Sequence, residues 1–350
     1  MPNINFSKLA DDIKTWGREL GFQQIGISDI DLSDAESHLQ SWLQNNFHGE
    51  MEYMQRHGSM RSHPEELVPG TMRIISARMD YLPADHQSIE VLKNSSLAFI
   101  SRYALGRDYH KVIRQRLQKL ADKIQDQTGE FGYRALVDSA PVMERAIAEK
   151  AGLGWIGKNT MLINKSAGSW FFLGELFTDL PLPIDDKAND HCGTCSACLD
   201  ICPTDAFVGP NTLDARKCIS YLTIELRTAI PEDLRPLMGN RVFGCDDCQL
   251  CCPWNKFSSP TTEHDFSPRH ELDRKDLVTL FNWTEEEFLE KTAGSPIRRI
   301  GYECWLRNLA VGLGNAKSSP DIITALKNRS NHSSALVKEH VHWALTQHGQ

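Results

Sequence analysis

The chain has 350 residues, of which 41% are hydrophobic and 24% charged, a composition typical of soluble globular proteins. This length exceeds one typical domain, so we expect two or three domains. The formal net charge of −8 excludes a uniformly basic coat for nucleic acid but allows a local basic face. No apolar run reaches the ~18 residues that a membrane helix needs, and the N-terminus lacks an apolar signal core. We therefore expect a cytoplasmic protein that does not enter a membrane.

The first part of the chain predicts a mixture of helices and strands. Apolar periodicity gives, in order, a helix over 5–22, a strand over 24–28, a helix over 35–45, a polar loop-like segment over 53–69, buried strands over 73–79 and 97–101, a helix from residue 110 and a strand over 133–137.

Basic residues gather at the start of the helix that begins near His110. Residues 102–119 contain a single acid, Asp108, and six basic residues, which are Arg102, Arg107, Lys111, Arg114, Arg116 and Lys119. Charge alone favours a solvated amphipathic helix. The alternative is a phosphate-binding stripe, beside which Tyr103, Tyr109 and His110 would stack on an unstacked base.

A carboxylate stands where the strand over 133–137 ends. Asp138 is followed by Ser139 and by Pro141, which we expect in the first turn of a helix that continues to Lys150. Local sequence favours Asp138 or Ser139 as the N-cap of this helix. The functional alternative is an acid catalyst at Asp138.

Glycines at 152, 154 and 157 match the dinucleotide-binding pattern G-x-G-x-x-G. That pattern should leave a strand and open a helix, whereas here it follows a helix, so Gly152 is better explained as a helix C-cap. We expect two buried strands next, over 158–163 and 169–178, joined as a hairpin by the turn at 164–168.

Two cysteine runs carry the strongest signal in the sequence. Cys192, Cys195, Cys198 and Cys202 have the spacing C-x2-C-x2-C-x3-C-P, which is typical of bacterial ferredoxins with [4Fe–4S] clusters. A second run contains Cys245, Cys248, Cys251 and Cys252, the last again before a proline. A zinc site would favour two separated C-x2-C pairs, and a disulfide framework would favour a short secreted chain. We therefore predict iron–sulfur clusters.

Two clusters need eight of the ten cysteines. In two-cluster ferredoxins the cysteine before proline serves the other cluster. This rule predicts one cluster on Cys192, Cys195, Cys198 and Cys252, and a second on Cys202, Cys218, Cys245 and Cys248. Cys251 is a rival to Cys252 because it keeps the x2 spacing. Cys304 has no cysteine neighbour in the sequence and is expected to be a buried apolar residue.

The segment after the second run reads as helical. Helices are expected over 277–281, 285–291, 303–313 and 334–347, and Arg298 and Arg299 form a basic knot between them. About 180 residues precede the clusters, which is far more than a ferredoxin needs, so we expect a redox catalyst with its own pocket. Neither the radical spacing C-x3-C-x2-C nor the cobalamin pattern D-x-H-x-x-G occurs. The residues alone thus predict an iron–sulfur reductase of unknown substrate.

Several motifs together resemble the epoxyqueuosine reductase family. They are residues 102–111 (RYALGRDYHK), 137–142 (VDSAPV), 152–159 (GLGWIGKN), 244–249 (GCDDCQ) and 305–314 (WLRNLAVGLG), with the first cysteine run. The resemblance covers nearly the whole chain. This family removes the epoxide oxygen of epoxyqueuosine at the wobble position of tRNA, and it is related to reductive dehalogenases. The sequence departs from the family pattern at Cys251, where an aliphatic residue is commoner, and its helical tail is short for the family.

The resemblance implies an α+β protein in three parts. These are a cobalamin-binding α/β catalytic domain over 1–182, a ferredoxin-like domain with two [4Fe–4S] clusters over 183–258, and a helical-repeat-like C-terminal domain over 259–350. It also implies base-off cobalamin as a cofactor and Asp138 as the proton donor, with a pKa raised by burial. The implied cobalamin contacts are Arg61, Asp138, Asn159, Leu162, Cys245 and Asp246.

The same resemblance implies a tRNA partner and an external low-potential electron donor, and we expect a monomer. The predicted tRNA-binding residues are Arg102, Arg107, Tyr109, His110, Lys111, Arg298 and Arg299. Two alternatives stay open at this point, a cobalamin-dependent reductase of a small molecule, similar to reductive dehalogenases, and an electron-transfer subunit without a substrate. The basic stripe speaks against the small-molecule reductase. The long N-terminal part speaks against the electron-transfer subunit.

Overall fold

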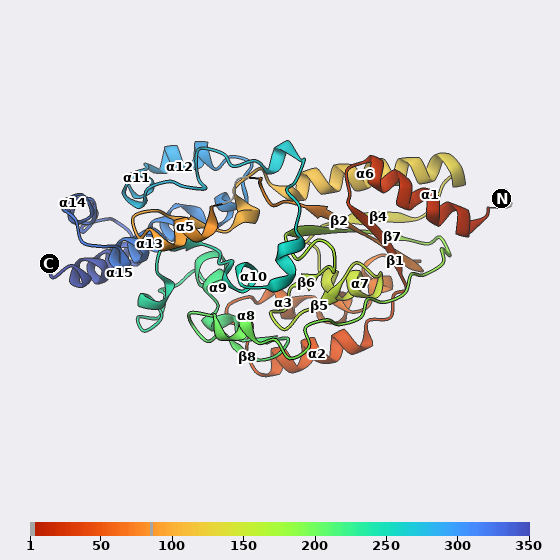
Figure 1. The fold of residues 1–350 in the computed structure, drawn as a ribbon, viewed down its shortest axis with the longest axis horizontal. Helices are drawn as coiled ribbons and strands as arrows, with labels where there is room; N and C mark the ends of the chain where they lie inside the picture. Colours follow the sequence, from red (N-terminus) through yellow and green to blue (C-terminus); the bar gives the residue numbers. More distant parts are fainter. Residues whose placement is uncertain (1–3, 85–86) are drawn as a thin grey trace.

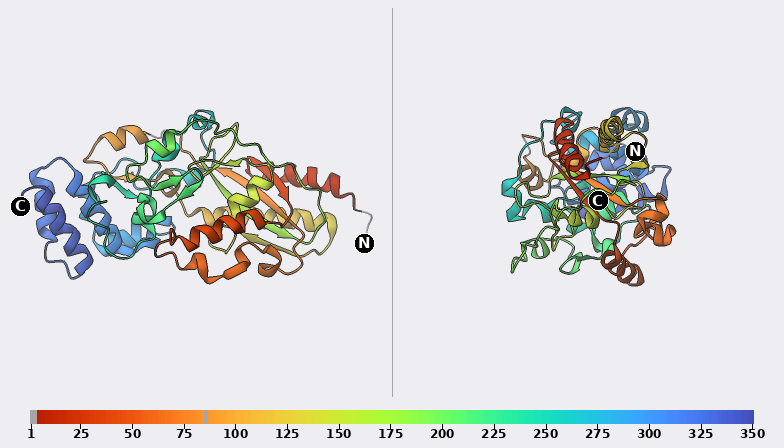
Figure 2. Two further views of the ribbon diagram at one scale, coloured as in Figure 1. Left: turned by 90° about the horizontal axis from the view of Figure 1, so that it is seen from below. Right: turned by 90° about the vertical axis from the view of Figure 1, so that its right-hand side faces the viewer.

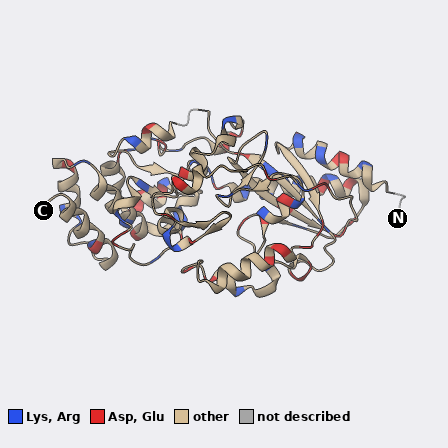
Figure 3. Ribbon diagram, turned by 60° about the horizontal axis from the view of Figure 1, so that its bottom comes forward, with Lys and Arg blue, Asp and Glu red and all other residues tan. Residues whose placement is uncertain are grey.

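The computed structural model describes residues 4–84 and 87–350 as an elongated molecule with its termini at opposite ends (Figure 1). A sheet lies toward the N-terminal end, the cysteine-rich segment lies in the middle, and helices form the C-terminal end (Figure 2). Lys, Arg, Asp and Glu are interspersed along the ribbon rather than separated into one basic half (Figure 3). None of the helices within the described ranges has the length and apolarity that crossing a membrane requires.

The main sheet has four strands in the order β1-β2-β7-β4. They are β1 (Gln24–Ser28), β2 (Arg73–Asp80), β7 (Phe171–Thr178) and β4 (Tyr133–Leu136), and each neighbouring pair is antiparallel. Ile74 and Ile75 are neighbours on β2 but belong to two different apolar clusters. Because successive strand residues point to opposite faces, both faces of the sheet are covered.

Helices α1 (Phe6–Glu19) and α6 (Tyr109–Thr128) cover one face. Each begins at a side chain that accepts a backbone hydrogen bond, Asn5 for α1 and Asp108 for α6. Helix α7 (Glu144–Lys150) lies against the other face, where Ile147 packs with Ile74. The expected mixture of helices and strands is therefore confirmed.

Three local predictions were wrong. Residues 53–69 are not a loop but hold the short helices α3 (Tyr53–Arg56), η1 (Gly58–Arg61) and α4 (Pro64–Leu67). Helix α7 begins at Glu144 with Met143 at its N-cap, so neither Asp138 nor Ser139 caps it. The expected hairpin is reduced to one bridge between Asn164 and Gly168, because β6 (Leu162–Ile163) pairs with β5 (Trp155–Ile156) while β7 joins the main sheet.

Short elements make up the rest of the first part and the cysteine-rich segment. They are α2 (Ser33–Gln44), α5 (Ser88–Lys93), β3 (Phe99–Ile100), η2 (Arg102–Ala104), α8 (Ala197–Asp200), β8 (Phe207–Gly209), β9 (Thr212–Leu213), η3 (Ala215–Lys217), α9 (Ile219–Ile224), η4 (Pro236–Met238), β10 (Arg241–Phe243), α10 (Asp247–Leu250) and η5 (Pro253–Phe257). Strand β10 pairs in parallel with β3, which joins residues far apart in the sequence.

The C-terminal part is helical, as predicted. Its elements are η6 (His264–Phe266), α11 (Leu277–Phe281), α12 (Glu285–Lys291), η7 (Pro296–Ile300), α13 (Gly301–Asn315), α14 (Pro320–Asn328) and α15 (Ala335–Gln347). Helix α13 is buried on all sides, and Cys304 is buried within it as expected. The core around α13 also includes Ala98, Ile100 and Leu105, so this stretch of the N-terminal part packs with the C-terminal helices.

Candidate active site

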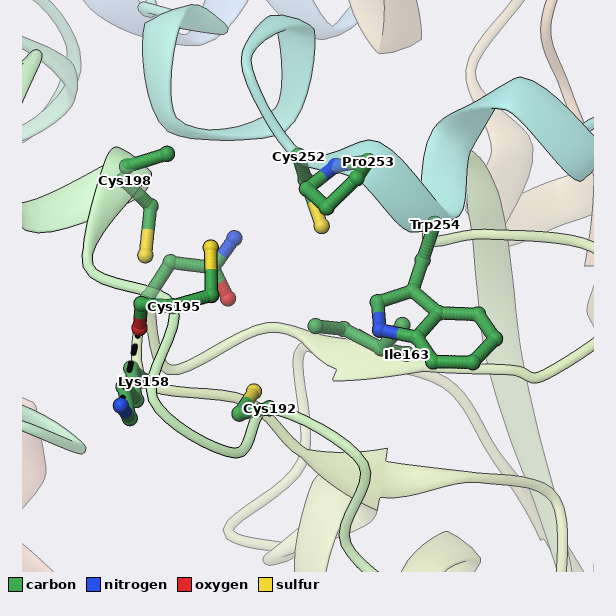
Figure 4. A pocket seen from close by; sticks show the side chains of 10 residues that line it. Lys158, Ile163, Cys192, Cys195, Cys198, Cys252, Pro253 and Trp254 are labelled. Atoms are coloured by element: carbon green, nitrogen blue, oxygen red, sulfur yellow. Dashed lines mark hydrogen bonds between the residues drawn. The ribbon is translucent and has the colours of Figure 1, made fainter.

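The first predicted set of cluster ligands surrounds one small cavity. Cys192, Cys195, Cys198 and Cys252 line a space of about 30 Å³ (Figure 4). Lys158 Nζ holds the loop in place, since it donates to the carbonyl oxygens of Gly193 at 2.7 Å and Cys195 at 2.8 Å. All ten cysteines are free of disulfides. The four thiols come from two separate segments, and the structure brings together the set that the cysteine count predicts for one [4Fe–4S] cluster.

Aromatic rings cover this cavity. Trp155 Nε1 donates to Cys192 Sγ at 3.4 Å, and its ring lies edge-on to Trp254 at a centroid distance of 5.2 Å. His191 packs against both tryptophans, at 5.1 Å and 5.7 Å. The hydrogen bond from an indole N–H and the apolar cover are features that tune the potential of a cluster.

The second predicted set also gathers in space. Burial and the nearby Cys218 raise the pKa of the Cys248 thiol and of the Cys245 thiol, the latter also through Asp247. Burial and the nearby Cys202 raise the pKa of Cys218. Cys202, Cys245 and Cys248 therefore each lie within electrostatic reach of Cys218. Within the described ranges, no three His, Cys, Asp or Glu side chains are arranged to hold a single metal ion.

Cys251 does not replace Cys252 in the first cavity. Cys252 lines this cavity, whereas Cys251 is absent from its lining and directs its Sγ toward the carbonyl oxygen of Cys248 at 3.6 Å. Burial, Cys198 and Cys252 together raise the pKa of Cys251 to about 12, so it lies beside the first ligand set as a thiol. Of the two candidates, Cys252, the cysteine before proline, is therefore the one that lines the cavity.

A large cavity lies where the three parts of the chain meet. Its volume is about 740 Å³, within the range of sites for small ligands and cofactors. Asp138 enters it from the sheet side, Cys218 from the cysteine-rich segment, and Arg298 from the C-terminal part. One chamber therefore joins a carboxylate, a predicted cluster thiol and a cation.

Asp138 is held by a hydrogen-bonded group of side chains. The Tyr109 hydroxyl donates to Asp138 Oδ2 at 2.8 Å, and His110 Nε2 lies 3.2 Å from the same oxygen. His110 Nδ1 lies 2.6 Å from Asp108 Oδ1, so the imidazole bridges two carboxylates. The Tyr109 ring stacks on Phe172 at 4.0 Å, which fixes its direction. The side chain of Asp138 stays 49% exposed toward the cavity.

These bonds reverse the expected electrostatics of Asp138. Burial raises the pKa of this carboxyl, but the hydrogen bonds from His110 and Tyr109 outweigh burial and hold the pKa below its usual value. Burial lowers the pKa of His110, yet its bonds to Asp108 and Asp138 raise the pKa to about 9. The prediction of a raised pKa at Asp138 was wrong, because its two neighbours were expected to face tRNA instead. At neutral pH the proton rests on His110.

The other predicted cofactor contacts lie outside the lining of the large cavity. Arg61 is buried, donates to the carbonyl oxygen of Tyr53 at 3.1 Å, and has no partner for Nε within the described residues. Asn159 Nδ2 donates to the carbonyl oxygen of Cys248 at 3.1 Å, and Asp246 accepts from the Arg102 backbone at 2.8 Å. Leu162 is buried in a small apolar cluster. Asn159 thus braces the backbone at Cys248, and Asp246, which follows Cys245 in the chain, braces the backbone at Arg102.

The predicted tRNA-binding residues separate into three groups. Tyr109, His110, Lys111, Arg298 and Arg299 line the large cavity, and Arg299 pairs with Glu225. Arg107 lies outside it, with a side chain 66% exposed and 3.3 Å from Asp265. Arg102 contradicts the prediction. It is 1% exposed, and its guanidinium donates to the carbonyl oxygen of Ile100 at 3.1 Å, because the chain turns inward after β3.

Sequence reasoning missed Glu144 and Arg145, which open helix α7. Glu144 Oε1 accepts from the backbone N–H of Asp138 at 2.6 Å, and the Arg145 guanidinium donates to the carbonyl oxygen of Thr160. Burial and the nearby Asp138 raise the pKa of Glu144 to about 8. Two adjacent charged residues at a helix start looked like ordinary surface positions, and no local pattern distinguishes them.

Comparison with known proteins decides the family. A family model described as epoxyqueuosine reductase QueG, DUF1730, matches residues 61–139, and a model described as a 4Fe-4S double cluster binding domain matches residues 191–255. The epoxyqueuosine reductase of Pseudomonas aeruginosa is 65% identical over 98% of this chain and 96% of its own length. That of Escherichia coli is 57% identical over 98% of this chain and 90% of its own.

The chain belongs to the epoxyqueuosine reductase family.

Solved epoxyqueuosine reductases have the same fold. A Bacillus subtilis structure, in which a catalytic loop named for its aspartate is swung out of the active site, has a TM-score of 0.89 and 26% identity, and the match covers 98% of this chain and 91% of that one. A structure with an epoxyqueuosine-modified tRNA stem loop has a TM-score of 0.88 and 27% identity, covering 99% and 92%. The chain is thus an oxidoreductase with a double-cluster domain, and the electron-transfer subunit is set aside.

Proposed function

We propose that this epoxyqueuosine reductase removes the epoxide oxygen of epoxyqueuosine at the wobble position of tRNA, using cobalamin, two [4Fe–4S] clusters and a proton from Asp138. The observation that carries the proposal is the 740 Å³ cavity, in which Asp138, the thiol of Cys218 and Arg298 meet. Removing an epoxide oxygen to leave an alkene consumes two electrons and two protons and releases water. The site must therefore provide a path for electrons and a source of protons.

The thiolates are suited to hold the electron carriers. Cys192, Cys195, Cys198 and Cys252 would hold the cluster near the surface, because Cys195 is exposed. Cys202, Cys218, Cys245 and Cys248 would hold the second cluster at the wall of the large cavity, because Cys218 lines it. This order favours entry of electrons from an external low-potential donor near Cys195.

The large cavity also fits a bulky cofactor. Its volume of about 740 Å³ is in the upper part of the usual range for cofactor sites, and Asp138 and Cys218 reach it from two sides. Base-off cobalamin bound there would supply a reduced cobalt to the epoxide carbon, while the clusters supply single electrons. Buried Arg61, whose pKa is lowered by burial and raised by Tyr53 and Asp138, lies within electrostatic reach of the same carboxylate.

The side chains around Asp138 provide the proton. The oxygen of an opened epoxide is an alkoxide, which leaves only when protonated. Asp138 Oδ2 takes a proton from His110, which the two flanking carboxylates keep protonated at neutral pH, and passes it to this oxygen as the first of the two protons. Water supplies the second proton to the released hydroxide. Tyr109 keeps its own proton, since burial and Asp138 raise its pKa well above 10. Its hydroxyl orients Asp138.

Basic side chains around the cavity would bind the phosphates of the tRNA. Lys111, Arg298 and Arg299 line it, and exposed Arg107 lies on the same turn of chain that begins α6. Such side chains bind phosphates in a manner that weakens steeply with salt. Tyr109 and His110 belong to the site through their bonds to Asp138, and we leave Arg102 out because it is buried. The tRNA stem loop bound to a solved relative supports tRNA as the partner.

The test is conversion of a tRNA stem loop that carries epoxyqueuosine. Loaded wild-type enzyme with a chemical reductant should yield queuosine, measured by mass spectrometry of the nucleosides. Asp138→Asn should lower kcat by about 10²- to 10⁴-fold, the usual contribution of general acid catalysis. Asp122→Asn, an exposed carboxylate on α6, is the matched control and should keep wild-type turnover. Full turnover by Asp138→Asn would contradict the proposed role.

A further inference from the structure

The backbone at Asp138 has a conformation that needs external support. Its φ is +45°, in the left-handed region that non-glycine residues rarely adopt. The residues that follow, up to Met143, form no helix or strand. The loop itself therefore does not fix the direction of the Asp138 side chain, which Tyr109 and His110 both contact at Oδ2.

Glu144 supplies that support from a rigid element. Its Oε1 accepts the backbone N–H of Asp138 at 2.6 Å, closing the loop onto the first residue of α7. The helix is anchored by Ile147 and Ala148, both fully buried against the sheet side of the protein. Arg145, the next residue, binds the carbonyl oxygen of Thr160, another left-handed residue with φ +65°. The start of α7 thus holds both strained positions of the cavity wall.

We infer that Glu144 is a positioning residue, which keeps the Asp138 loop turned into the cavity by accepting the Asp138 N–H. The inference rests on the proposed function of Asp138 and deepens it. The swung-out loop of the Bacillus subtilis relative gives the alternative position that Glu144 would disfavour here. Without this acceptor, the left-handed conformation loses its partner and the loop should leave the cavity.

Glutamine separates positioning from proton transfer. A Gln side chain has the same reach as Glu and keeps a carbonyl oxygen for the Asp138 N–H, but it cannot donate a proton as an acid. Burial and Asp138 raise the pKa of Glu144 to about 8, so the residue is largely neutral at pH 7 and Gln mimics that form. A positioning role tolerates Gln, whereas an acid role does not.

The experiment combines hydrogen exchange with turnover on the loaded enzyme. For Glu144→Ala, the amide exchange rate of residues 137–143 should rise at least about 10-fold. Its kcat should fall about 10- to 100-fold, the loss expected when a catalytic group is misplaced. For Glu144→Gln both should stay within about threefold of wild type. If Glu144→Ala does not fold, Glu144→Asp, which is one methylene shorter, should show the same losses.

The matched control is Glu149→Ala on the same helix. Glu149 Oε1 accepts the backbone N–H of Ile156 at 2.8 Å, so this variant also removes a helix-borne acceptor. Exchange should then rise at Ile156 and not over 137–143. The inference is overturned if Glu144→Gln loses as much turnover as Glu144→Ala, or if Glu144→Ala leaves loop exchange unchanged. Neither readout depends on Asp138→Asn, whose full turnover would instead contradict the proposed function.

Discussion

At the scale of single residues, the site is a balance between burial and hydrogen bonding. Burial acts to raise the pKa of the Asp138 carboxyl, but Tyr109 and His110 both bond to its Oδ2 and stabilise the charged form. The imidazole of His110 gains more from Asp108 and Asp138 than it loses to burial, so its pKa rises to about 9. The proton is held on His110, one hydrogen bond away from the carboxylate that we propose delivers it.

This balance predicts a pH dependence of stability at His110. A folded-state pKa of about 9, above the ordinary 6.5, means that the contribution of His110 to the free energy of unfolding is fully present below pH 6.5. It is lost as the pH rises through about 9. Relative to His110→Gln, wild type should therefore be about 1–3 kcal/mol more stable at pH 6 than at pH 9.5. Urea unfolding at both pH values measures this, and a pH-independent difference would exclude a protonated His110.

The sequence identified the chemistry-bearing residues better than their partners. The cysteine spacing predicted two ligand sets, because the ferredoxin rule depends on residue spacing, and the first set lines one cavity. Asp138 was found through the motif that carries it. Its partner Glu144 was not, because a bond from a helix start back to a strained loop leaves no periodic signal. Arg102 was misplaced for a similar reason, since charge does not reveal the inward turn after β3.

At the scale of elements, α7 is the part that couples the sheet to the cavity. Its C-terminal end lies against β1 so closely that a Cβ on Gly26 would overlap the carbonyl oxygen of Ala151. Its N-terminal end holds Asp138 through Glu144. The position of the carboxylate thus depends on packing at the far end of the helix. The sequence predicted this helix but placed its start at Pro141, because the bond to Asp138 was not foreseen.

Close packing at Gly26 predicts a costly substitution. Gly26→Ala should lower the free energy of unfolding by about 1–3 kcal/mol, the usual cost of overpacking, because a backbone carbonyl must move. Gly209→Ala on β8 is the control, since its Cβ would meet nothing within 4 Å, and it should change stability by less than about 0.5 kcal/mol. Denaturant midpoints report both. Equal stabilities would mean that α7 has room to shift.

At the scale of the whole molecule, the three parts of the chain are joined around one chamber. The Asp108 backbone N–H donates to the carbonyl oxygen of Gly294 at 2.8 Å, and the Arg227 guanidinium donates to the carbonyl oxygen of Ile300 at 2.9 Å. The C-terminal part therefore fixes the start of α6, which carries Tyr109 and His110, and also contacts the cysteine-rich segment. Such contacts between distant segments could not be predicted from local patterns, although composition and length already required a pocket beyond the clusters.

The measurement that tests the central claim most directly is nucleoside analysis of tRNA from cells that lack this protein. The account predicts that epoxyqueuosine accumulates and queuosine disappears in these cells. A plasmid with the wild-type chain should restore queuosine, and one with Asp138→Asn should not. Normal queuosine without the protein, or full restoration by Asp138→Asn, would contradict the account.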